Sequence, residues 1–426
     1  KRRGFCPSCG ARRMVESAAL QVDDVFPREP IRQWVLSFPF QLRFLFASYP
    51  ELMGRVLGIV YRTLATHIIH EAGFTKSTAH TGAVTLIQRF GSALNLNVHF
   101  HMLALDGVYT DDCMDAGGRA THGAVAEDAY GKIRFHRIKA PTTDKLGVLA
   151  HRISQRVARF LDRCGFLERD DEHTYLVLET SDDEAMQQLY GHSITYRIAI
   201  GPHQGRKVFT LQSLPPVEEP KEGSSRVANV AGFSLHAGVM AEAHQRDKLE
   251  RLCRYIARPA VSEKRLSLLD DGRIRYELKT PYRDGTTHVF FEPLDFLARL
   301  AALVPKPRVN LTRFHGVFAP NSKYRIKITP AKRGKGRKRG AGEDEPCCSS
   351  PAERRAAMTW AQRLKRVFSI DIEVCPKCSG AVKIIASIED PVVIDKILSH
   401  LDKKAALNEE VVLPQSRAPP QASLFD

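Results

Sequence analysis

Two histidines one residue apart are the most informative feature of the sequence. The run Asn97-Val98-His99-Phe100-His101 alternates polar and apolar side chains, which is typical of a strand with one buried face. On such a strand His99 and His101 lie on the same side, about 7 Å apart along the backbone. Two imidazoles at this spacing can bind one metal ion. The alternative is a pair of histidines on the polar face of a half-buried strand, with no metal.

Two imidazoles leave a metal ion under-coordinated, so at least a third ligand is needed. Residues 83–89 and 96–105 are β-rich runs separated by Gly91 and Asn95, and this pattern predicts a hairpin or neighbouring strands. Gln88, near the end of the first run, is the third ligand that we favour. An exposed strand glutamine without a metal is the alternative.

A tyrosine among cations is the second feature that could do chemistry. Helical spacing in residues 248–258 places Tyr255 on one stripe with Arg251 and Arg258, beside Arg254. Guanidinium groups hold phosphate oxygens and favour a phenolate over a phenol. A phenol with a pKa of about 10 is scarcely ionised at neutral pH, so its attack on a phosphodiester requires a metal ion that polarises the phosphate. The alternative is a tyrosine packed at the rim of a helix interface.

Together the two features define one reaction. Attack by Tyr255 on single-stranded DNA would leave a 5′-phosphotyrosine and a free 3′ hydroxyl, and the phosphotyrosine bond would conserve the energy for later rejoining. His99 and His101 would hold the metal ion that stabilises the leaving 3′ oxygen.

Regular elements must position these residues. Apolar periodicity and turn residues predict a strand at 34–38, helices at 51–71, 143–164 and 247–258, and a hairpin of 274–278 with 288–291. Gly73 is the predicted cap of the first helix, and Pro259 ends the last one. The Gly-rich, acidic stretch 111–131 is typical of a surface insertion. A last small domain is predicted to contain a helix from about residue 356, then a strand and a helix ending near residue 401.

The composition places these motifs in a basic globular protein. The chain has 426 residues, 43% hydrophobic and 26% charged, enough for two or three domains. Its formal net charge of +15 makes a polyanion the expected partner, and nucleic acid is the commonest one. No long apolar run and no signal peptide occur in the sequence, which predicts a soluble, cytoplasmic protein with no membrane partner.

The cysteines indicate zinc rather than a disulfide framework, because nine is an odd number and they are spread over a long chain. Two Cys-x-x-Cys turns occur, and a structural zinc site usually needs four ligands. The zinc-binding candidates are Cys6, Cys9, Cys375 and Cys378. The two pairs could share one zinc, or Cys347 and Cys348 could complete the second site. A redox-active pair is the less favoured alternative.

A basic run lies late in the chain, where residues 332–340 contain six basic side chains in nine positions. Such a run would follow DNA phosphates without reading bases, and a solvated linker is the alternative. The DNA-binding candidates are Arg251, Arg254, Arg258, Lys332, Arg333, Lys335, Arg337, Lys338 and Arg339.

Four segments spaced along the chain carry a family resemblance. They are residues 87–94 followed by the two histidines, residues 253–259, residues 278–288 and residues 313–317. In this order they resemble the insertion sequence ninety-one family of rolling-circle transposases. The resemblance extends from Cys6 to about Leu401.

The resemblance implies an α+β fold of the HUH endonuclease type, an antiparallel sheet flanked by helices with the histidine pair on a central strand. It implies Mg²⁺ or Mn²⁺ as the catalytic cofactor, His99 and His101 as its ligands, and Tyr255 as the nucleophile. Many relatives carry a second tyrosine four residues before the first, where this chain has Arg251. Either Tyr255 then acts alone, once per protomer of a homodimer, or another tyrosine such as Tyr282 takes part.

The resemblance also implies small zinc-ribbon-like modules at both ends of the chain. The predicted domains are a truncated amino-terminal zinc-binding module at 1–30, an HUH-type catalytic domain at 31–330, a basic linker at 331–355, a carboxy-terminal CxxC module at 356–405 and a disordered tail at 406–426. The truncation is an interpretation of the half-complete cysteine motif and the initial Lys1.

The function we predict is that of a nucleoid-associated bacterial DNA transposase. It would nick single-stranded DNA at insertion-sequence ends through a 5′-phosphotyrosine intermediate. Two alternatives stay open. A truncated, inactive remnant would bind DNA through its zinc modules and basic face, whereas an HUH replication initiator or relaxase would use the same chemistry at a plasmid origin.

Overall fold

The computed structural model describes the chain in segments. The described residues are 7–111, 133–169, 174–176, 184–215, 226–332, 359–376, 378–383, 386, 388 and 390–405. Contacts divide the chain into two compact units, Lys1–Pro351 and Ala352–Asp426. Most of the predicted surface insertion, the basic run after Lys332 and the predicted disordered tail lie outside the described residues.

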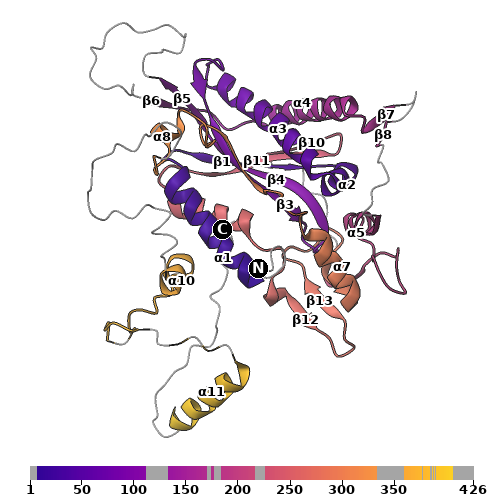
Figure 1. Cartoon of the computed structure of the whole chain (residues 1–426), viewed down its shortest axis with the longest axis vertical. Helices are drawn as coiled ribbons and strands as arrows, with labels where there is room; N and C mark the ends of the chain where they lie inside the picture. The colour runs from indigo at the N-terminus through magenta and orange to yellow at the C-terminus, as the bar shows by residue number, and fades with distance from the viewer. Residues whose placement is uncertain are drawn as a thin grey trace. The chain divides into compact units, whose positions relative to one another are not determined.

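A six-stranded sheet forms the centre of the first unit (Figure 1). Its strands lie in the order β10 (Val227–Val230), β11 (Phe233–Ala241), β1 (Ile31–Ser37), β4 (Leu96–Leu105), β3 (Gly82–Phe90) and β15 (Thr312–Gly316). Every neighbouring pair is antiparallel. With helices packed on this sheet, the fold is of the α+β class, and this prediction is confirmed.

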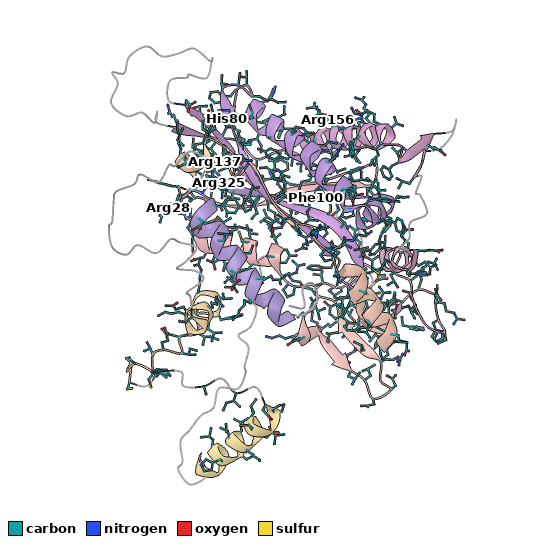
Figure 2. The ribbon with its side chains drawn as sticks, in the orientation of Figure 1. Arg28, His80, Phe100, Arg137, Arg156 and Arg325 are labelled. Carbon is teal, nitrogen blue, oxygen red and sulfur yellow. The ribbon has the colours of Figure 1, made fainter. Side chains whose placement is uncertain are left out.

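Helices pack on both faces of the sheet. On one face, α2 (Phe40–Ser48), α3 (Pro50–Glu71) and α4 (Thr143–Arg163) share a core with Phe100 of β4, labelled in Figure 2. On the opposite face, α1 (Pro7–Leu20), the π-helix η1 (Gln21–Val25) and α6 (Arg246–Ala257) pack with Leu103 and Leu105. Alternate side chains of β4 therefore enter two different cores, as the period of a strand requires.

The long helix α3 shows how local sequence sets an element. Leu52, Val56 and Leu64 recur at helical spacing and are buried, while Pro50 occupies the first turn, where its missing N–H costs no hydrogen bond. Gly73 follows with a φ of 81°, the left-handed conformation of a helix cap. The predicted helix 51–71 and its glycine cap are confirmed.

Strand β1 begins earlier than predicted because two polar residues at its start are buried. Arg32 Nε and Nη2 each lie 2.7 Å from a carboxylate oxygen of Asp106, and Nη1 donates to the Ala237 carbonyl at 3.0 Å. Gln33 contacts the histidine pair described below. Polar residues at these positions resemble a loop in the sequence, but long-range partners satisfy them inside the sheet.

Smaller sheets extend the first unit. A four-stranded sheet has the order β12 (Leu266–Leu268), β13 (Ile274–Glu277), β14 (Thr286–Phe291) and β9 (Phe209–Gln212). A three-stranded sheet has the order β2 (Ala79–His80), β5 (Gly107–Asp111) and β6 (Ile133–Arg137). A two-stranded sheet pairs β7 (Leu167–Arg169) with β8 (Thr174–Leu176). The remaining helices are α5 (Glu184–Ile194), the 3-10 helix η2 (Glu263–Arg265), α7 (Pro293–Leu303) and α8 (Arg325–Ile328). The predicted hairpin is confirmed as β13 and β14.

The amino-terminal segment differs from the prediction. Residues Pro7–Leu20 form helix α1 instead of the predicted Cys-x-x-Cys turn, so Cys9 lies within a helix. Cys6 lies outside the described residues. The helix follows from Pro7, which is favoured in a first turn, and from the good helix formers Ala11 to Met14. Ala18 then packs in the core beneath α6.

The second unit contains α10 (Trp360–Phe368) and α11 (Pro391–Ala405). Between them Val374 and Ala381 form an isolated antiparallel bridge, and the Cys375 N–H donates to the Gly380 carbonyl at 2.9 Å. Cys375 and Cys378 lie in the turn closed by these contacts, and neither forms a disulfide. The predicted helix near 356 begins at Trp360, four residues later.

Candidate metal and tyrosine site

The two histidines lie side by side on the central strand β4, on the face covered by α1 and α6. Their strand neighbours Leu103 and Leu105 belong to the core on that face, whereas Phe100 belongs to the opposite core. His99 and His101 are 9% and 6% exposed. The alternation predicted for this strand is confirmed.

The Nε2 atoms of the two imidazoles lie next to each other, and each Nδ1 atom contacts a neighbouring polar group. His99 Nε2 lies 3.1 Å from His101 Nε2. His99 Nδ1 contacts the Asn97 carbonyl at 2.8 Å, and His101 Nδ1 contacts Gln33 Nε2 at 2.8 Å. A carbonyl can only accept, so His99 Nδ1 carries the proton and His99 Nε2 is left with a lone pair facing His101.

Burial keeps both rings neutral at physiological pH. Desolvation lowers the pKa of His99 to about 4, outweighing the Asn97 hydrogen bond, and nearby Arg258 and Arg43 act in the same direction as burial. Desolvation also lowers the pKa of His101 well below its ordinary value, with His99 and Arg258 adding to it. Neutral imidazole is the form that binds a metal ion.

Two oxygen-bearing side chains lie on the same face as the pair. Gln88 of β3 is directly opposite His99 in the register and is 4% exposed. Its Nε2 donates to the Ile256 carbonyl at 2.5 Å. Asn97 precedes His99 by two residues, and its Oδ1 is buried without a hydrogen-bond partner among the described residues. Asn97 is thus a second candidate for the ligand role predicted for Gln88.

Helix α6 brings Tyr255 to the histidines. Leu249, Leu252, Cys253 and Ile256 are buried on its sheet-facing stripe, as predicted. The half-buried ring of Tyr255 lies 6.4 Å from the His101 ring, centroid to centroid, in an edge-on arrangement. Residues far apart in the sequence are therefore brought together as the proposed chemistry requires.

Two cations lie over the Tyr255 ring. The Arg258 guanidinium carbon is 3.9 Å from the ring centroid, and its Nη1 donates to the Tyr255 carbonyl at 2.8 Å. Lys279 Nζ is 4.8 Å from the same centroid. Such contacts fix the ring by cation–π attraction and place positive charge where a phosphate would approach.

Tethers at two points hold α6 against the sheet. Near its start, Arg246 donates to the carbonyls of Val22, Phe26 and Pro27, at 3.0 Å to Phe26 and 2.9 Å to Pro27. Near its end, the Gln88 amide bonds the Ile256 carbonyl. The residue next to Tyr255 is therefore fixed directly to the strand beside β4.

Other predicted site residues lie apart from this cluster or are not described. Arg251 is exposed, and Arg254 Nη1 lies 3.8 Å from Glu250 on the same helix. Tyr282 has no hydrogen bond or ring contact with His99 or His101 among the described residues. Its hydroxyl accepts a hydrogen bond from Ser92 Oγ at 3.3 Å. Lys332 is exposed. The DNA-binding candidates outside the described residues are Arg333, Lys335, Arg337, Lys338 and Arg339.

Gln33, Asn97 and Lys279 are the residues that sequence reasoning missed. Gln33 lies just before the predicted strand 34–38, and the alternation of that strand would place it on a polar face. Lys279 lies within the segment 278–288 that carries the family resemblance, but nothing in the sequence indicated that its ammonium lies over the Tyr255 ring. Among the described residues, no three His, Cys, Asp or Glu side chains gather closely enough to bind one metal ion.

A comparison with protein families identifies the class of protein. The chain matches a family described as "Putative transposase", Y2_Tnp, over residues 82–325, more than half of its length. The matched range begins at β3, includes β4 with its histidine pair and α6, and ends at α8. The chain belongs to this transposase family, whose members act on DNA.

Two further comparisons returned nothing. No curated protein and no solved structure matches the chain. In the part of the chain that is described, no helix has the length and apolar character needed to span a bilayer.

Proposed function

We propose that this transposase cuts single-stranded DNA with Tyr255 as the nucleophile, in the rolling-circle manner of the insertion sequence ninety-one family. The observation that carries the proposal is the convergence of Tyr255, Arg258 and Lys279 with the buried pair His99 and His101. The proposal includes cutting at insertion-sequence ends and later joining by the same tyrosine. It also includes a homodimer with one Tyr255 per protomer.

The residues present fit a divalent cation. Two ligands at about 2.1 Å from an octahedral ion are roughly 3 Å apart, close to the 3.1 Å between His99 Nε2 and His101 Nε2. Asn97 Oδ1, which has no hydrogen-bond partner among the described residues, and the Gln88 amide offer oxygen on the same face. Such an ion would polarise the phosphate and stabilise the leaving oxygen. Imidazole suits transition metals better than magnesium, so manganese is the first cation to test.

The chain's own residues would bind the phosphate and form the new bond. Arg258 and Lys279 would hold the phosphate oxygens beside the phenol. The Tyr255 oxygen would form a bond to phosphorus while the bond from phosphorus to the 3′ oxygen breaks. The phenol proton leaves and the departing 3′ oxygen gains one, so the products are a 5′-phosphotyrosine and a 3′ hydroxyl. Because both histidines are neutral, they would add no positive charge beside the phosphate. Their role would be that of metal ligands.

Zinc at the carboxy-terminal Cys375 and Cys378 is a second part of the proposal. The hairpin turn that carries both thiols supports it, since a Cys-x-x-Cys turn presents two thiolates to one zinc.

The test is a covalent-adduct assay with labelled single-stranded element DNA and Mn²⁺. Wild-type protein should give a slow, protease-sensitive band, and Tyr255→Phe should lose it while DNA affinity stays nearly unchanged. His99→Ala should also abolish the adduct. Tyr282→Phe is the matched control and should keep it. An adduct that persists in Tyr255→Phe removes this tyrosine from the mechanism, and DNA binding without any adduct in wild type favours the inactive remnant.

A further inference from the structure

One face of the four-stranded sheet is open. Its other face is buried, because Tyr276, Val289 and Phe291 belong to a core there with residues of α7 packed against it. Arg275 and Phe290 alternate with these residues along β13 and β14, so they lie on the open face.

A row of side chains crosses this open face. Ser267, Arg275, Phe290 and Phe209 are direct partners on the four neighbouring strands. Directly paired residues have their side chains about 5 Å apart and on the same side. Phe209 is 41% exposed and Phe290 is half-buried. The two phenyl rings therefore form an aromatic surface that solvent reaches.

The polar neighbours of the rings are mainly basic. The Arg273 guanidinium carbon lies 5.7 Å from the Phe290 centroid, but this arginine also pairs with Asp271 at 2.6 Å. Arg275 donates to Ser267 Oγ at 3.0 Å and has no ion pair among the described residues. Its charge is available to an anion. Exposed Arg206 and Lys207 lead into β9.

The open face leads toward Tyr255. Strand β13 carries Arg275 and ends at Glu277, two residues before Lys279, whose ammonium lies over the Tyr255 ring. Four residues of chain span at most about 13 Å. One acidic residue, Glu277, lies between them in the sequence, across from His288.

We infer that Phe209, Phe290 and Arg275 form a platform for single-stranded nucleic acid. Exposed aromatic rings beside cations suit unpaired bases, which stack on the rings while the phosphates meet the charges. In duplex DNA the base faces are stacked inside the helix, so a duplex could contact only the cations and not the rings. A second copy of this chain is the rival occupant, but a two-fold contact centred on the rings would bring Arg275 and the cations before β9, Arg206 and Lys207, close to like charges of the other copy. The inference deepens the proposed function by assigning where the substrate strand lies.

The experiment measures equilibrium binding of a fluorescent oligothymidine to the full-length chain in buffer without Mg²⁺ or Mn²⁺, so that no cutting occurs. Phe209→Leu and Phe290→Leu keep the apolar bulk and remove the ring. Each should raise Kd at least about fivefold. Phe40→Leu is the control, because Phe40 is 51% exposed with the Arg43 guanidinium 4.7 Å from its centroid, on helix α2. The control should leave Kd unchanged, and duplex DNA should bind all variants nearly equally.

The outcomes separate this platform from the proposed reaction. A Phe209→Leu/Phe290→Leu protein that binds oligothymidine as wild type does overturns the platform, even where the Tyr255 adduct forms. A dimer that dissociates in this variant, with unchanged DNA affinity, overturns it in favour of a second copy. Weakened binding with no adduct in wild type supports the platform and removes the proposed nuclease. Circular dichroism confirms that each variant is folded.

Discussion

Gln33 holds the His101 ring through Nδ1, and a turn of its amide that brings Oε1 to this position would accept the Nδ1 proton and leave the lone pair at Nε2 for a metal ion. The contact is 2.8 Å long and buried. We predict that Gln33→Leu lowers Mn²⁺ affinity about 10-fold to 100-fold, as loss of a hydrogen-bonded partner of a ligand does. Titration calorimetry or the Mn²⁺ paramagnetic resonance signal measures it. Gln155→Leu is the control, because Gln155 contacts His151 at 2.9 Å on the exposed face of α4. Equal affinity in wild type and Gln33→Leu contradicts the role.

His315 gives a pH prediction separate from the metal. Its ring stacks on Tyr61 with centroids 4.7 Å apart, and desolvation lowers its pKa to about 4. The folded state therefore binds its proton less readily than the unfolded state, whose histidines titrate near 6.5. The stabilisation is complete above about pH 6.5 and is lost as the pH falls toward 4, at roughly 1.4 kcal/mol per pH unit.

Urea denaturation from pH 7.5 to 5 measures this slope. His315→Gln should unfold with a free energy that depends less steeply on pH than that of wild type. Gln155→Leu, which changes an exposed side chain on α4 that does not ionise, should keep the wild-type slope. An unchanged slope in His315→Gln would falsify the assignment.

Helix α6 is the element on which the proposed chemistry depends, and Arg246 is its anchor. We predict that Arg246→Ala lowers the free energy of unfolding by about 2 kcal/mol, because three carbonyls lose a charged donor. The adduct yield should fall with it, since Tyr255 is on the same helix. Arg251→Ala changes an exposed arginine of that helix and should cost less than about 0.5 kcal/mol. Equal unfolding midpoints for the two variants would contradict the anchor role.

The basic run after Lys332 concerns the whole molecule, because its charges are part of the net charge of +15 that makes a polyanion the expected partner. Replacing Arg333, Lys335, Arg337, Lys338 and Arg339 by glutamine should reduce the slope of log affinity against log salt. For single-stranded DNA the reduction is about 0.7 per phosphate contact, up to roughly 3.5 for five contacts.

The matched control for the basic run removes charge elsewhere. Arg152, Arg159 and Arg163 are exposed on α4, and their replacement by glutamine lowers the net charge without touching the run. We expect a small change in the salt slope for this control. An equal change per residue in both proteins would indicate that only the overall charge matters.

The order of residues along the chain already specified much of this protein. Period-two alternation specified β4 and the shared side of His99 and His101, because neighbouring strand residues must point to opposite faces. Helical spacing specified the buried stripe of α6 and the exposed side of Arg251. The net charge and motif order indicated a DNA transposase, and the family match agrees with that. These features are local or additive, so no knowledge of packing was needed.

Packing alone decided which distant residues meet. Gln33 reaches His101 and Lys279 reaches Tyr255 only after β1, β13 and α6 are placed, and no spacing in the chain encodes those contacts. The same reason explains the errors. Strand β1 begins before the predicted residue 34 because Asp106 pairs with Arg32, and the residues after Pro7 form a helix instead of a turn because that helix packs its apolar side beneath α6. Long-range contacts outweigh local preference wherever burial supplies a partner.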